Sequence, residues 1–409
     1  MRKEIHGKGT IVNQCLSFLG HLLAFVSLGT SATFFVMIRR PLARFTAGPK
    51  IVGQSVSPYL ALAGALGAAL GLAGRAPLPI GAGLAGAGLA IGYCMRVTAP
   101  HGAFDRGLGP AWHAVIPADR AARMLPRRWH WWQPRAPRSR VRRRIAVGEA
   151  PGSDQALYAN VWEPPSDVTP SGLALVYVNS GGWAFSYPER WNEPTFRHLA
   201  AQGHVVMDFH PRTWRESDLS GLVGDVKCAV HWMKQHGPRS GVAPDRVAVA
   251  GQSAGGHLAL LAAYAHLPAL TPEELQGEDL AVCGVVAYYP PTDLALFHAH
   301  NRRWQQARNV LGGVPEEVPE TCALLSPLDY VAANCPPTLL FQGTHDSDVP
   351  VQTTRALHRR LAAAGVPSVY VEFPFTEHAF DLLLPRLAPA GQAALYDVER
   401  FLGWLAFRP

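Results

Sequence analysis

The stretch Arg246–Leu261, RVAVAGQSAGGHLALL, decides the fold that we expect for this chain. It begins with a short apolar run typical of a buried β-strand. It ends with an Ala- and Leu-rich segment, Gly256–Tyr264, typical of a helix. Between them lies the turn Gly251-Gln252-Ser253-Ala254-Gly255. A serine between two glycines at a strand-to-helix turn predicts a nucleophile elbow, in which a Cβ on either glycine would collide with the neighbouring strand or helix.

Apolar runs alternate with helical stretches from about residue 145 onward. The predicted strands are Ala156–Trp162, Leu173–Val178, His204–Phe209, Arg246–Ala250, Val282–Tyr289, Thr338–Gln342 and Ser368–Phe373, and the predicted helices are roughly 192–202, 218–236, 254–266, 353–364 and 389–407. This alternation predicts an α/β domain with a mostly parallel sheet and helices on both faces. We expect it to span 145–409, with a lid insertion at about 290–326.

Nucleophilic catalysis by a serine requires a base and an acid that orients this base. In this architecture their order along the chain is serine, acid, histidine. The loop after Thr338–Gln342 carries two candidate acids, of which we select Asp346 and keep Asp348 as the alternative. His378 follows the next predicted strand and is the expected base for Ser253.

The loop after Leu173–Val178 reads Asn179-Ser180-Gly181-Gly182-Trp183. Adjacent glycines leave backbone N–H groups uncovered, so we expect Gly181 and Gly182, together with Ala254, to form an oxyanion hole. The loss of one such donor typically costs ~3 kcal/mol of transition-state stabilisation. Trp183 is expected to contact the substrate. The alternative is a tight turn without a ligand.

Three stretches near the start contain no charged residue: Ile11–Ile38, Ile51–Gly74 and Ala76–Met95. Each is long enough to cross ~30 Å of hydrocarbon as a helix. We therefore predict a transmembrane arm of about three helices over residues 1–100. A buried helix pair of a soluble protein is the alternative for the second and third stretches. Gly67-x-x-x-Gly71 and Gly88-x-x-x-Gly92 have the spacing that lets membrane helices approach closely.

The charge is divided unevenly along the chain. Residues 1–144 carry a net charge of +17 and residues 145–409 a net charge of −10. Ten arginines and three tryptophans lie within 120–144, without an acidic residue. We interpret 101–144 as a basic juxtamembrane linker that contacts anionic lipid headgroups. A solvated linker is the bland alternative, and nucleic-acid binding is disfavoured because no nucleic-acid fold motif accompanies the arginines.

Basic residues also predict how a membrane arm would be oriented. Arg39, Arg40, Arg44 and Lys50 follow the first uncharged stretch, and positive loops stay in the cytoplasm. We therefore expect a multi-pass protein whose catalytic domain is cytoplasmic, although basic residues at the N-terminus argue against this orientation. Six cysteines without C-x-x-C spacing predict no metal site, and we expect no cofactor.

Residues from about 150 to 409 resemble the α/β-hydrolases of the hormone-sensitive-lipase-like and carboxylesterase groups. The resemblance is carried by GQSAGGHL, GTHDSDVPV, TEHAF and SGGW. It is strongest to membrane-associated bacterial esterases and isoprenylcysteine methylesterases. It implies Ser253 as nucleophile, Asp346 as acid, His378 as base, and Gly181, Gly182 and Ala254 as oxyanion donors. The usual His-Gly-Gly-Gly loop is altered here, because Asn179 and Ser180 replace its first two residues.

Three functions remain open at this point. The first is a membrane-anchored serine hydrolase that cleaves a hydrophobic carboxylic ester through an acyl-enzyme. The second uses the same triad on an amide, as an amidase, arylformamidase or peptidase. The third is a binding module without catalysis, which the altered Asn179-Ser180 loop suggests.

Overall fold

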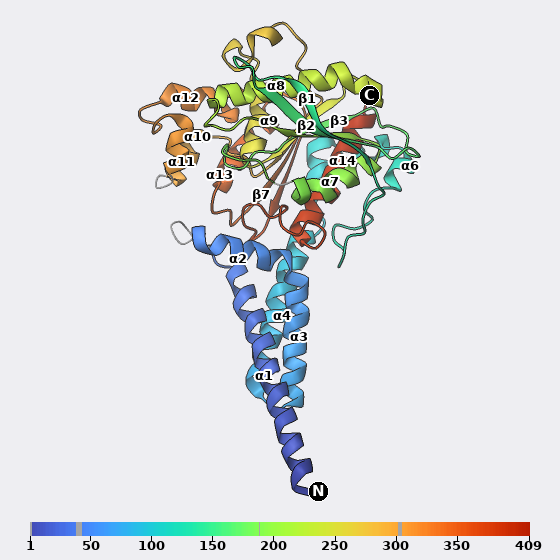
Figure 1. The fold of residues 1–409 in the computed structure, drawn as a ribbon, viewed down its shortest axis with the longest axis vertical. Helices are drawn as coiled ribbons and strands as arrows, with labels where there is room; N and C mark the ends of the chain where they lie inside the picture. Colours follow the sequence, from blue (N-terminus) through green and yellow to red (C-terminus); the bar gives the residue numbers. More distant parts are fainter. Residues whose placement is uncertain (1, 38–42, 188, 302–304) are drawn as a thin grey trace.

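An eight-stranded sheet in the order β1-β2-β4-β3-β5-β6-β7-β8 forms the centre of the globular domain. The pairs β1–β2 and β2–β4 are antiparallel, and the other neighbours are parallel. The computed structural model describes the whole chain except residues 1, 38–42, 188 and 302–304 (Figure 1). The strands are β1 (Arg140–Glu149), β2 (Ala156–Glu163), β3 (Ala174–Val178), β4 (Val205–His210), β5 (Val247–Gln252), β6 (Gly284–Tyr288), β7 (Thr338–Gly343) and β8 (Ser368–Phe373).

All strands predicted from the sequence are present, but the prediction missed β1. Its arginines were assigned to the basic linker 101–144, whereas Arg140 and Arg142 form ion pairs with Glu163 of β2. The Arg144 guanidinium lies over the Tyr158 ring. Arginines alternate poorly with apolar residues, so the strand pattern was hidden. Charged side chains suit an edge strand because they oppose pairing with other chains.

Helices cover both faces of the sheet. They are α7 (Glu189–Ala201), α8 (Leu219–His236), α9 (Ala254–Tyr264), α13 (Val351–Ala363) and α14 (Pro389–Phe407). One core cluster joins side chains of α8, α9 and α13 to one face. The other joins α7 and α14 to the opposite face, and it also includes Phe34 and Tyr93 from the N-terminal helices. The predicted α/β fold is therefore confirmed, and the N-terminal helices share one of its cores.

The segment 101–133 packs against the globular domain instead of forming a free linker. It contains α5 (Ala103–Leu108), the 3-10 helix η1 (Trp112–Val115) and the short helix α6 (Ala118–Ala121). The Leu125 N–H donates to Glu399 of α14, and Arg128 forms an ion pair with Asp397 of the same helix. Arginines in this segment therefore neutralise carboxylates of α14.

The insertion expected at about 290–326 contains helices and, within its described residues, no strand. They are α10 (Leu294–His300), α11 (Gln305–Leu311) and α12 (Pro319–Leu324). They follow β6 and therefore lie beyond the carboxyl edge of the sheet. Residues 302–304 of the expected lid fall outside the described residues.

The N-terminal helices project from the globular domain as a three-helix arm with a fourth helix across its top (Figure 1). The arm consists of α1 (Arg2–Phe34), α3 (Ser57–Ala73) and α4 (Pro77–Thr98). The fourth helix, α2 (Ala43–Ser55), meets α3 at an angle of 78°. Two helical segments, Asn13–Phe34 and Pro77–Leu108, are long and apolar enough to cross a membrane, and the bent pair α2–α3 is a third candidate.

The single straight helix expected over Ile51–Gly74 is therefore wrong. Pro58 lies in the first turn of α3, where its missing N–H and its ring prevent α2 from continuing straight. Only the 17 residues of α3 run alongside α1 and α4.

Small residues let the arm helices approach closely. A Cβ on Gly64 would lie 2.6 Å from the Gly83 carbonyl oxygen, and one on Gly67 would lie 2.7 Å from the Ala24 nitrogen. The prediction for Gly67 is confirmed, but the prediction for Gly88 is wrong because nothing lies within 4 Å of its Cβ position. The pattern G-x-x-x-G identified the spacing on α4 but selected the wrong side of the helix.

We expect Gly64→Val to destabilise the arm, because the added side chain overlaps the backbone of α4. Overpacking of this kind typically costs about 1–3 kcal/mol. Gly88→Val is the matched control on an open helix face. Thermal unfolding midpoints in detergent should fall clearly for Gly64→Val and change little for Gly88→Val. Equal midpoints for the two variants would contradict the helix packing described here.

Candidate active site

The turn between β5 and α9 holds Ser253 in a conformation that few non-glycine residues adopt, with φ of 51° and ψ of −120°. Both flanking glycines are needed there. A Cβ on Gly251 would lie 2.3 Å from the backbone carbon of Gly255, and a Cβ on Gly255 would lie 2.1 Å from the Val178 carbonyl oxygen. The prediction that close backbone approach requires both glycines is confirmed.

Ser253, His378 and Asp346 form one continuous chain of hydrogen bonds. The Ser253 Oγ lies 3.0 Å from His378 Nε2, and His378 Nδ1 lies 2.8 Å from Asp346 Oδ2. These residues follow β5, β8 and β7, so the carboxyl edge of the parallel sheet brings them together. When the imidazole is neutral, Nδ1–H donates to the carboxylate and Nε2 is free to accept from the serine hydroxyl.

The loop after β7 holds the Asp346 carboxylate firmly. Its Oδ1 accepts from the backbone N–H groups of Asp348 at 2.9 Å and Val349 at 2.7 Å. Its Oδ2 also accepts from Gln342 Nε2 at 2.8 Å. Asp348, the alternative acid, thus contributes a backbone donor to Asp346, while Asp346 contacts His378. This geometry favours Asp346 over Asp348 as the partner of the histidine.

The surroundings of His378 shift its protonation equilibrium. Burial lowers the pKa of the imidazole, but the Asp346 carboxylate outweighs burial. With smaller contributions from Asp348 and Glu377, the pKa is raised from 6.5 to about 9. The protonated imidazole is therefore favoured near neutral pH when no substrate is bound.

The glycine loop lies beside the elbow, but its donors are not equivalent. The Gly181 N–H donates to the Phe185 carbonyl at 2.7 Å, so this predicted oxyanion donor is already engaged within its own turn. Gly182 has a positive φ of 54°, and Ala254 is the first residue of α9, where helix geometry leaves its N–H without an intrahelical acceptor. Gly182 and Ala254 therefore remain the better placed of the three predicted donors.

Trp183, the predicted substrate contact, lies in the core instead of on the open side of the loop. Its side chain is 2% exposed, and its Nε1–H donates to His257 Nδ1 at 3.2 Å. The His257 Nε2 faces the Leu325 carbonyl, and burial lowers the pKa of this histidine to about 4. The expectation that His257 points into the fold is confirmed. Phe185, at 52% exposure, is the exposed aromatic residue of this loop.

Asn179 takes over the shaping of the altered loop. Its Nδ2 donates to the Tyr187 carbonyl at 3.1 Å and to Asp208 Oδ1 at 3.3 Å, and its Oδ1 accepts from the Tyr187 N–H at 2.8 Å. The Ser180 carbonyl accepts from the Gly255 N–H at 3.2 Å, which ties the loop to the elbow. The replaced residues thus form a specific hydrogen-bond network.

Sequence reasoning missed a buried group beside the histidine. Asp381 accepts hydrogen bonds from the side chains of Gln252 and Tyr289, and the Tyr289 ring centroid lies 4.4 Å from that of His378. Burial raises the pKa of the Asp381 carboxyl. Each residue ends or follows a strand on the same sheet edge, and this placement is the pattern by which they might have been found.

Comparisons with known proteins agree with this geometry. Residues 160–361 match the family model described as BD-FAE. A probable carboxylic ester hydrolase of Mycobacterium tuberculosis, LipM, is 31% identical over 266 residues, which cover 61% of this chain and 58% of that protein. The isoprenylcysteine alpha-carbonyl methylesterase ICME of Arabidopsis thaliana is 26% identical over 269 residues, which cover 63% of this chain and 60% of that protein. The chain thus matches less than two thirds of either relative.

A solved structure is similar over the same domain. The propionate-bound esterase Est2 of Thermogutta terrifontis has 26% sequence identity and a TM-score of 0.52, covering 65% of this chain and 94% of that chain. The fold, the elbow and these similarities define the class of protein: the chain is an α/β-hydrolase. Within that superfamily it belongs with the esterases, as the sequence motifs predicted.

We expect Asp346→Asn to lower the pKa of His378 from about 9, because the variant removes the main effect that raises it. A histidine with a raised pKa stabilises the fold below its unfolded pKa of 6.5, and this contribution is lost as the pH rises through about 9. The loss of thermal stability in the variant should therefore be largest below pH 6.5 and should shrink toward pH 9. Unfolding midpoints measured across this range test the expectation.

Asp348→Asn is the matched control, because Asp348 acts on His378 more weakly. Its stability deficit should vary less with pH. A steeper pH dependence for Asp348→Asn than for Asp346→Asn would reverse the assignment of the two carboxylates.

Proposed function

We propose that this chain is a membrane-anchored serine hydrolase that cleaves a hydrophobic carboxylic ester. The hydrogen-bonded chain from Ser253 through His378 to Asp346 carries the proposal, because it provides a nucleophile, a base and an orienting acid in reach of one another. The similarity to named esterases supports an ester as the substrate.

In this mechanism His378 Nε2 takes the proton of Ser253 as Oγ attacks the ester carbonyl carbon. The alcohol leaves with a proton from His378, and an acyl-enzyme remains on Ser253. Water, deprotonated by the same imidazole, then attacks the acyl carbon and releases the acid. Asp346 stabilises the imidazolium in both steps. Because the pKa of His378 is raised, the rate should increase with pH above 6.5.

Backbone N–H groups stabilise the negative oxygen that forms in each step. We assign this role to Gly182 and Ala254, with the dipole of α9 behind them. Gly181 joins them only if its bond to the Phe185 carbonyl opens. The exposed Phe185 ring lies against Gly181 and suits an apolar acyl or alcohol group.

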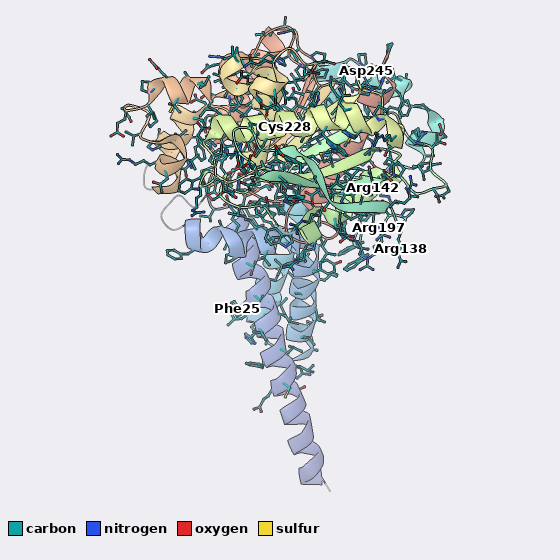
Figure 2. All side chains as sticks on the ribbon, turned by 45° about the horizontal axis from the view of Figure 1, so that its top comes forward. Phe25, Arg138, Arg142, Arg197, Cys228 and Asp245 are labelled. Atoms are coloured by element: carbon teal, nitrogen blue, oxygen red, sulfur yellow. The ribbon has the colours of Figure 1, made fainter. Side chains whose placement is uncertain are left out.

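The arm supports the membrane part of the proposal. Its outer surface exposes apolar side chains such as Phe18, Phe25 and Leu66, and Figure 2 shows Phe25 directed away from the helices. Three crossings by α1, α3 and α4 place the N-terminus on the side opposite the globular domain (Figure 1). We propose a cytoplasmic catalytic domain. Arg39 and Arg40 fall outside the described residues, and reporter fusions at both ends of the chain test the orientation.

A basic cavity offers a contact for anionic headgroups. It has a volume of about 360 Å³ and is lined by Arg135, Arg190, Arg197 and Arg386. In the described part of the chain, no carboxylate forms an ion pair with these four arginines. The Arg386 guanidinium lies over the ring of Trp132, which is 57% exposed. Figure 2 shows Arg197 and Arg138 at the side of the domain from which the arm leaves.

We expect Ser253→Ala to lower kcat for short p-nitrophenyl esters by about 10⁴-fold or more, because it removes the nucleophile. A fluorophosphonate probe should label the parent protein and not this variant. Ser220→Ala, at the start of α8, is the control and should retain labelling and activity.

Two results would overturn the proposal. Full activity in Ser253→Ala would remove the nucleophile, and an unlabelled parent protein would favour a binding module. Faster cleavage of matched amides than of esters would replace the esterase with an amidase.

We expect phosphatidylglycerol to stabilise the detergent-solubilised protein more than phosphatidylcholine does. An anion in the cavity would relieve repulsion among its arginines, and a ligand that binds only the folded state raises the unfolding midpoint. The double variant Arg197→Gln/Arg386→Gln should lose this difference. Arg239→Gln/Arg359→Gln, two exposed arginines elsewhere on the domain, should keep it, and a loss in both pairs would indicate a diffuse charge effect.

A further inference from the structure

The segment Phe375–Glu377, which leads directly into His378, is held by the arm. Gln54 of α2 bonds to both of its ends: its Nε2 donates to the Phe375 carbonyl at 2.7 Å, and its Oε1 accepts from the Glu377 N–H at 3.1 Å. The Gln54 side chain is 3% exposed. A single side chain of the arm thus fixes the backbone one residue before the histidine.

A buried ion pair reinforces this contact. The Lys50 Nζ of α2 lies 3.7 Å from Glu377 Oε2, and both side chains are 1% exposed. The Glu377 Oε1 accepts from the backbone N–H groups of Ser347 at 2.6 Å and His378 at 3.1 Å. Ser347 follows Asp346, so the Glu377 carboxylate joins the acid loop to the histidine loop, and Lys50 neutralises its charge.

Other parts of the arm grip the same segment. Phe35, just after α1, packs its ring 4.8 Å from that of Phe375, and the Tyr93 hydroxyl of α4 lies 3.2 Å from Thr376 Oγ1. Phe375 and Ala379 have φ of 60° and 57°, so strained residues flank His378. Such conformations persist only where surrounding contacts hold them. Much of this support comes from the arm.

From these contacts we infer that α2 is a positioning element of the active site, and that Lys50 and Gln54 align His378 with Ser253 and Asp346. The inference rests on the proposed function of the triad. The arm then does more than attach the enzyme, because a displacement of α2 relative to the sheet moves the base. Turnover is thereby coupled to the packing of the arm.

The test compares full-length Lys50→Met and Gln54→Met with the parent in detergent, on a short water-soluble p-nitrophenyl ester. Misplacing a catalytic group by about 1 Å typically lowers the rate on the order of 100-fold. We expect kcat to fall by about 10- to 100-fold while KM changes little, because neither residue contacts the substrate. Lys50→Met/Glu377→Gln should recover part of kcat, since the buried carboxylate no longer lacks a partner.

Lys227→Met is the matched control. Lys227 of α8 is also a buried lysine, but it donates to the Ala265 carbonyl at 2.7 Å and to Thr271 Oγ1 at 2.8 Å, away from the histidine loop. This variant should lose thermal stability and keep kcat. If Lys50→Met and Gln54→Met also keep kcat, α2 is only a tether and the inference is wrong.

Amide hydrogen exchange of the peptide that contains residues 373–380 separates this inference from the esterase proposal. Exchange there should be about tenfold faster or more in Lys50→Met and Gln54→Met than in the parent or Lys227→Met, whether or not the protein cleaves esters. Unchanged exchange overturns the positioning role. Faster exchange in a parent that neither cleaves esters nor reacts with fluorophosphonate would retain the contact and remove the enzyme.

Discussion

The close approach of three backbones at Ser253 is the constraint on which the rest of the structure depends. Gly255 touches the end of β3, and Gly251 touches the start of α9, so β3, β5 and α9 meet without intervening side chains. This contact fixes the height of the Ser253 hydroxyl above the sheet. It also brings the loop after β3 to the elbow, where the Ser180 carbonyl accepts from the Gly255 N–H.

The sheet and the three polar residues were predictable because they follow local rules. A strand followed by a helix at Gly-x-Ser-x-Gly has a periodic pattern on both sides, and the carboxyl edge of a parallel sheet gathers the later loops. The choice between Asp346 and Asp348 was harder, because either can follow β7. Only the hydrogen bonds of the folded loop distinguish them, with Asp348 donating its N–H to Asp346.

The errors share a cause, because they concern contacts between segments far apart in the sequence. Trp183 stands beside the glycine loop, but its partner His257 lies 74 residues away. Lys50 resembled a loop charge near a membrane span, yet it pairs with Glu377 across the molecule. Neither residue type nor spacing reports such pairings. The direction in which the arm packs was equally hidden, since Gly64 and Gly88 look alike in the sequence.

The arginine-rich edge strand has a practical consequence for shortened versions of the protein. A chain that begins at residue 145, where composition alone places the boundary, would cut β1 in half and remove the arginines that pair with Glu163. The freed backbone of β2 would then present unsatisfied N–H and C=O groups along an apolar strand, which invites strand-to-strand aggregation. Soluble expression of the isolated domain therefore depends on retaining Arg140–Arg144.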